Sequence, residues 1–185
     1  MQLDTYHFLL FSHLIFLMVG FGSVIVIDVC GIFWLANKIK LSFISKVANI
    51  TQPLIWIGWS GLVLSGIPLL LIKGSISDIT VLKLFAVFML ALNGIYLHII
   101  KDNFKKYQSE EHIPKLLYFR IGLATFVSQI CWWTAIVIGF LNNKLKANAP
   151  SVENPYLYIK IFLIIVLVTF LVGEITLKNK RKRAH

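Results

Sequence analysis

Four ionisable side chains stand inside long apolar runs of the sequence, where a charge is costly. They are His13 and Asp28 in the first run, and Lys83 and His98 in the third. Ionisable groups within membrane-spanning segments usually face the interior of the helix bundle or a watery cavity, so each is a functional candidate. Glu174 lies near the end of the fifth run, a few residues before a basic tail, and we expect it at the membrane interface.

The spacing of these residues predicts two polar layers. The two members of each run are fifteen positions apart, which in an α-helix is a rise of about 22 Å and a return to within about 60° of the starting face. If the first and third helices touch, His13 and Lys83 form an outer layer, and Asp28 and His98 form an inner layer. A carboxylate beside an imidazole makes a charge-assisted hydrogen bond. The inner pair would suit a proton relay, a metal site or a haem ligand oriented by a carboxylate, and would equally suit a buried pair that only fixes packing.

Uncharged polar and aromatic residues in the apolar runs indicate a second place for function. We predict a pocket lined by Trp59, Asn93, Ser128 and Gln129. The alternative is that these residues hold helices together, as small and polar residues do in lipid. The sequence has no glycine-rich phosphate loop, no HExxH and no CxxC, so no metal site is predicted from a motif. Catalytic residues stay unknown, and whether the protein is an enzyme stays open.

The composition predicts the elements that position these residues. The chain has 185 residues, of which 58% are hydrophobic and 14% charged, whereas a soluble domain is about a quarter charged. Five runs are long enough to cross a hydrocarbon core of about 30 Å; they cover residues 7–36, 53–72, 79–100, 117–141 and 156–177. The runs lack the alternation of polar and apolar residues that membrane strands show. We therefore predict an all-α membrane bundle of five helices in a single domain, residues 1–185.

The basic residues predict the orientation of this bundle. Five spans place thirteen lysines and arginines in segments on one side and three on the other. The positive-inside rule then puts the N-terminus outside and the C-terminus in the cytoplasm, here of a bacterial inner membrane. The net charge of +10 thus indicates topology, and we expect no nucleic-acid partner. The expected partners are the lipid bilayer itself and anionic lipids at the tail KNKRKRAH.

Two segments carry a likeness to a known group. His13 opens the stretch HLIFLMVGFG, and Lys83 lies in VLKLFAVFMLALNG. These segments resemble the small bacterial membrane proteins that include the copper-resistance D family and the bacterial membrane protoporphyrinogen oxidase. The resemblance covers about the first hundred residues and implies haem ligation by His13 and a functional requirement for Lys83. The fifth run and Asp28 are additional to the pattern of that group.

Three functions agree with this sequence. The first is a membrane-embedded haem-binding or redox-linked protein with His13 or His98 as the axial ligand; the two are expected near opposite membrane faces, so they cannot ligate one iron together. The second is a proton- or cation-coupled transporter or channel that uses Asp28 and His98. It would work as a homo-oligomer, because five helices enclose only a narrow pore. The third is a non-catalytic assembly subunit of the membrane whose polar residues fix packing.

Overall fold

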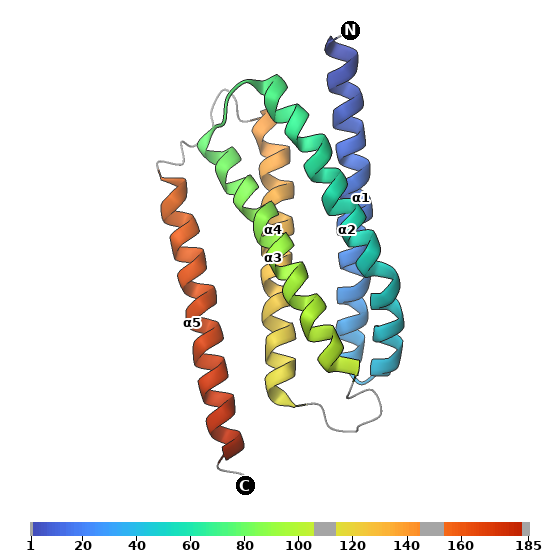
Figure 1. Ribbon diagram of the computed structural model, residues 1–185, viewed down its shortest axis with the longest axis vertical. Helices are drawn as coiled ribbons and strands as arrows, with labels where there is room; N and C mark the ends of the chain where they lie inside the picture. The colour runs from blue at the N-terminus through green and yellow to red at the C-terminus, as the bar shows by residue number, and fades with distance from the viewer. Residues whose placement is uncertain (1, 106–113, 145–153, 183–185) are drawn as a thin grey trace. The chain divides into compact units, whose positions relative to one another are not determined.

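The chain folds into five long helices. The computed structural model describes residues 2–105, 114–144 and 154–182, and Figure 1 shows helices α1 (Gln2–Leu35), α2 (Leu41–Lys73), α3 (Asp78–Lys105), α4 (Lys115–Lys144) and α5 (Pro155–Lys182). Within those three stretches there is no strand, and each of the five helices is long and apolar enough to cross a membrane. The prediction of an all-α protein with five such helices is confirmed.

Helix α2 is longer than the sequence predicted. We expected a connection over residues 37–52 and a span beginning at Pro53, but the helix begins at Leu41 and runs through both Pro53 and Pro68. Leu41 and Thr51 are buried, so packing of these first turns stabilises a helix that their polar neighbours alone do not predict. A proline lacks the backbone N–H and removes one helical hydrogen bond, a loss that membrane helices tolerate when neighbouring groups satisfy the freed carbonyl.

The turns that end α1 and α2 use residues with positive φ. Asn37, at φ 57°, follows α1, and the N–H groups of Asn37 and Lys38 donate to the carbonyls of Trp34 and Phe33, each at 2.8 Å. These two hydrogen bonds form a Schellman motif, which satisfies backbone carbonyls that have no hydrogen-bond partner within the helix. Gly74, at φ 70°, ends α2 in the same left-handed conformation, which glycine adopts without steric cost.

Polar side chains lie at the beginnings of α3 and α5. At α5, the Oδ1 of Asn154 accepts the N–H of Leu157 at 3.1 Å, and Pro155 takes the first helical position, where its missing N–H costs nothing. At α3, the hydroxyls of Ser77 and Thr80 lie 2.8 Å apart. The side chain of Asn154 therefore caps α5, whereas the contact at α3 joins two side chains.

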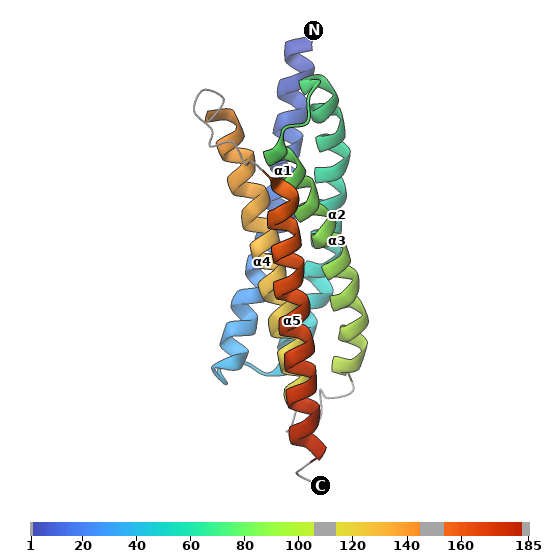
Figure 2. The same ribbon diagram turned by 90° about the vertical axis from the view of Figure 1, so that its left-hand side faces the viewer.

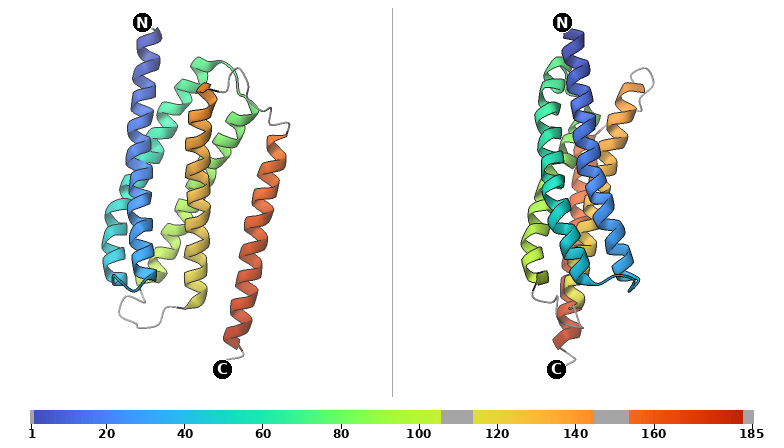
Figure 3. Two further views of the ribbon diagram at one scale, coloured as in Figure 1. Left: turned by 180° about the vertical axis from the view of Figure 1, so that it is seen from behind. Right: turned by 90° about the vertical axis from the view of Figure 1, so that its right-hand side faces the viewer.

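Contacts between helices divide the chain into two units, Met1–Ile76 and Ser77–His185. In the first unit, α1 and α2 form an antiparallel hairpin and lie side by side (Figures 1 and 3). In the second unit, α3 and α4 run antiparallel in extensive contact, and α5 contacts both of them less (Figure 2). The prediction that all five helices form one bundle stays a prediction.

Helix α5 has the most exposed apolar surface. Its most apolar stretch of 18 residues contains no buried residue, and Ile164, Ile165 and Val172 are each more than half exposed. Soluble monomers rarely expose a continuous apolar surface of this extent. Such a helix suits a lipid surrounding, where apolar side chains need no cover.

Candidate functional site

His13 of α1 is held by a hydrogen-bond chain that ends on α2. Its Nδ1 lies 2.9 Å from the Oγ of Ser65, and that hydroxyl lies 2.6 Å from the carbonyl oxygen of Gly61. A serine hydroxyl has one proton. Because the Ser65 hydroxyl donates it to the Gly61 carbonyl, Ser65 accepts the proton of His13 Nδ1–H. A neutral imidazole in this arrangement has its lone pair on Nε2.

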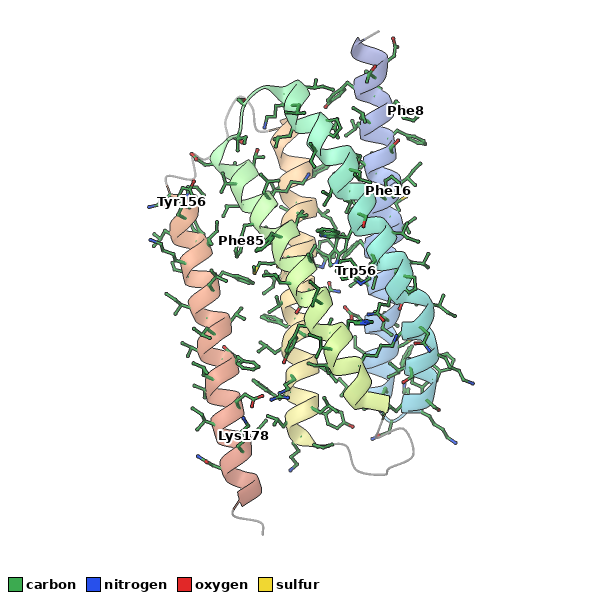
Figure 4. All side chains as sticks on the ribbon, in the orientation of Figure 1. Phe8, Phe16, Trp56, Phe85, Tyr156 and Lys178 are labelled. Carbon is green, nitrogen blue, oxygen red and sulfur yellow. The ribbon has the colours of Figure 1, made fainter. Side chains whose placement is uncertain are left out.

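Small residues on α2 allow α1 to approach closely enough for this chain to form. A Cβ atom at Gly58 would overlap the backbone of Gly20, and a Cβ atom at Gly61 would overlap the ring of Phe16, which Figure 4 shows on α1. Gly58 and Gly61 are both buried, and they lie about one helical turn apart on the same face. Small residues on one face let helix backbones approach closely in lipid.

The imidazole of His13 packs beside Gly66, which has no side chain. The Cε1 of His13 lies 3.4 Å from the position that a Cβ atom would take at Gly66. Gly66 directly follows Ser65, which is only 5% exposed. The ring of His13 is therefore fixed by a buried hydroxyl on one side and has a residue without a side chain next to it.

The other three charged candidates lie on α1 and α3. Asp28 is half-buried on α1. On α3, Lys83 is half-buried, with its Nζ 3.5 Å from the position of a Cβ atom at Gly139 of α4. His98, near the other end of α3, is exposed. Because His13 and Asp28 belong to the first unit and Lys83 and His98 to the second, the two predicted layers stay predictions.

The residues predicted to line a pocket make contacts of several kinds. Asn93 is buried, and its Nδ2 donates to the carbonyl oxygen of Ala124 at 2.9 Å, which joins α3 to α4. Gln129 accepts a hydrogen bond of 3.1 Å from the indole N–H of the exposed Trp133. Ser128 is half-buried. These contacts agree with the alternative of helix packing for Asn93, and the pocket stays a prediction.

Trp59, the fourth of these residues, lies on α2. Its ring meets that of Trp56 edge to face, with 5.7 Å between the ring centroids. Edge-to-face pairs of this kind are a favourable arrangement of aromatic rings. Trp59 belongs to the first unit, and Asn93, Ser128 and Gln129 belong to the second, so a pocket shared by all four stays a prediction.

An ion cluster joins α4 to α5, and sequence reasoning missed it. Glu174 is 7% exposed; its Oε1 lies 2.5 Å from Arg120 Nε, and its Oε2 lies 2.9 Å from Lys178 Nζ. Beside it, a Cβ atom at Gly173 would overlap the ring of Phe119. From the sequence, Arg120 was one of the thirteen basic residues that predict the orientation of the chain. The signal that could have found the cluster is an acid and an arginine that each lie within an apolar run, because buried charges need partners.

Side chains that could ligate a metal do not cluster in the part of the chain that the structure describes. Within residues 2–105, 114–144 and 154–182, no three His, Cys, Asp or Glu side chains lie close enough together to hold an ion. Cys30 and Cys131 are both free thiols. No family model, curated protein or solved structure matches the chain. The candidate site therefore depends on the geometry at His13.

Proposed function

We propose that this chain is a multi-pass protein of the bacterial plasma membrane that binds haem, with His13 as the axial ligand of the iron. The observation that carries the proposal is the chain from His13 Nδ1 through Ser65 Oγ to the Gly61 carbonyl. Histidines that ligate metals usually donate their other ring N–H to a fixed acceptor, which sets the tautomer and the direction of the ring. His13 has this arrangement, so the residue fits the demands on an axial ligand.

The proposal is for ligation by a single histidine. His7 precedes His13 by six positions, a rise of about 9 Å along the helix, so the two imidazoles cannot share one iron from opposite sides. With Nδ1–H donated to Ser65, the lone pair of the neutral imidazole lies on Nε2, the atom that would ligate the iron. Bound haem would supply one-electron redox chemistry. The protein's own part would be to hold His13 in one orientation through Ser65.

The proposed orientation has the N-terminus outside and the C-terminus in the cytoplasm. It is supported by the distribution of lysines and arginines, thirteen against three, since basic residues are retained on the cytoplasmic side. His13 would then lie toward the outer face. The alternative of a proton- or cation-coupled transporter that uses Asp28 and His98 stays a prediction.

Titration of the purified full-length chain with haemin tests the proposal. We expect a Soret band that saturates at one haem per chain, its loss in His13→Ala, and its retention in His7→Ala, a matched control on the same helix. Circular dichroism of each variant checks that the helices are intact. A folded His13→Ala variant that binds haemin as the unmodified chain does would refute the assignment of His13.

A further inference from the structure

A cavity of about 190 Å³ lies between α3, α4 and α5 of the second unit. Its walls include Phe85, Ala86, Cys131, Thr134, Tyr158 and Phe162. The rings of Phe85 and Phe162 meet edge to face with their centroids 6.0 Å apart, so α3 and α5 touch beside the cavity; Figure 4 labels Phe85. No side chain of the wall is charged. The cavity therefore suits an apolar occupant.

The position of the cavity along the helices gives its depth. Phe85 and Phe162 each lie seven residues after the first residue of their helices, Asp78 and Pro155, a rise of about 10 Å. The headgroup region occupies only about 5–8 Å on each side of the hydrocarbon core. In a bilayer that α3 and α5 cross, the cavity thus lies just inside the hydrocarbon core, beside the headgroups at the N-terminal ends of these two helices. Tyr158 is 57% exposed, and its ring with a polar tip suits this level.

Helix α5 is held differently at its two ends. Toward its C-terminal end, the Glu174 carboxylate is paired with Arg120 of α4, and Phe119 fills the space at Gly173. Toward its N-terminal end, the cavity separates parts of α5 from α3 and α4. A void leaves its lining atoms without van der Waals partners. An occupant of the cavity would supply those contacts and hold this end of α5 in place.

We propose that this cavity binds one acyl chain of a membrane phospholipid. An apolar cavity of about 150 Å³ stays free of water and admits an apolar molecule the size of benzene, so a cavity of about 190 Å³ can take several methylene groups. The uncharged wall leaves the phosphate of the lipid outside, at the level of the helix ends. This site is independent of the proposed haem ligand, since it lies wholly in the second unit.

Lipid retention in matched variants tests the proposal. Thr134→Phe fills the cavity, whereas Thr169→Phe makes the same change at an exposed position of α5. Each full chain is purified in detergent with phosphatidylglycerol of 16- and 18-carbon tails, and retained lipid is identified by native mass spectrometry. We expect the unmodified chain and Thr169→Phe to retain one phospholipid and Thr134→Phe to lose it. Equal retention in all three, retention by none, or a prenyl compound in place of phospholipid would overturn the proposal.

The two cysteines give a second test that needs no bulky substitution. Cys131 is 2% exposed and lines the cavity, whereas Cys30 lies half-buried on α1. Reaction with N-phenylmaleimide is followed at Cys131 in a Cys30→Ser chain and at Cys30 in a Cys131→Ser chain. At a phosphatidylglycerol concentration ten times the dissociation constant, Cys131 should react about tenfold more slowly, and Cys30 at an unchanged rate. An unchanged rate at Cys131, or equal slowing at both thiols, would overturn the proposal even if Thr134→Phe does not fold.

Discussion

The substitution Gly58→Ala should destabilise the α1–α2 hairpin more than Gly61→Ala or Gly22→Ala. An alanine Cβ at this position would stand 2.5 Å from the backbone nitrogen of Gly20 and would also overlap the Cα of that residue. Carbon atoms in good contact are about 3.5–4.0 Å apart. Backbone atoms cannot rotate away as side chains do, so the two helices would have to separate by about 1 Å.

The cost of this separation can be worked from the packing. A gap of about 1 Å forfeits roughly half of the dispersion attraction between the atoms that it parts, and overpacked sites lose about 1–3 kcal/mol of folding free energy. Gly61→Ala should cost less, because its Cβ meets the ring of Phe16, which can turn. Gly22→Ala is the control: nothing lies within 4 Å of its Cβ position, and alanine is favoured over glycine in a helix by about 0.8–1 kcal/mol.

The assay is equilibrium unfolding of the purified chain by sodium dodecyl sulfate in mixed micelles, followed by circular dichroism. We expect the free energy of unfolding of Gly58→Ala to fall below that of Gly22→Ala by about 1–3 kcal/mol, because the gain in helix propensity is common to both, with Gly61→Ala between them. If Gly58→Ala and Gly22→Ala unfold at the same detergent fraction, the close approach of α1 and α2 at Gly58 is wrong. The hydrogen bond between His13 and Ser65 would then lose its structural basis as well.

Four further substitutions test individual contacts. Ser65→Ala should keep the haem but shift its Soret band, because the imidazole loses the acceptor of its Nδ1–H; an unshifted spectrum would speak against this orientation. Glu174→Gln should lower the free energy of unfolding in detergent by about 1–2 kcal/mol, a value reduced because Arg120 and Lys178 are partly exposed. Lys178→Gln should lower it by less than about 1 kcal/mol. The reverse order would contradict a buried carboxylate shared by two cations. Asn93→Leu should lower the free energy of unfolding by about 1 kcal/mol, the usual range for a polar contact between membrane helices. A thermal melting temperature equal to that of the unmodified chain would show that the hydrogen bond from Asn93 to α4 contributes nothing to stability.

The sequence predicts the helices well because their formation is a local property. Each apolar run must satisfy its own backbone groups, and a long run can do so only as a helix. The early start of α2 at Leu41 escaped prediction, since the segment from Leu41 to Gln52 mixes polar and apolar residues and its helix depends on burial of Leu41 and Thr51. That burial is a property of the folded chain.

The candidate site was predicted only in part, because its contacts join distant residues. His13 could be singled out from its place in an apolar run, but its hydrogen bond to Ser65, 52 positions away, could not. The expected contact of His13 with Lys83 stays a prediction. Arg120 and Glu174 are 54 positions apart and pair across two helices. Which helix faces which is decided by surfaces such as the glycines of α2, and their complementarity is not visible in a single sequence.

Haem content is the measurement that tests the central claim most directly. The full chain is purified from membranes of haem-replete cells without added haem, and its absorbance spectrum is compared with its iron content. The account predicts a Soret band and equal amounts of iron, haem and protein, all lost in His13→Ala while the helices remain. A folded, colourless chain that holds no iron and gains no Soret band with added haemin would contradict it.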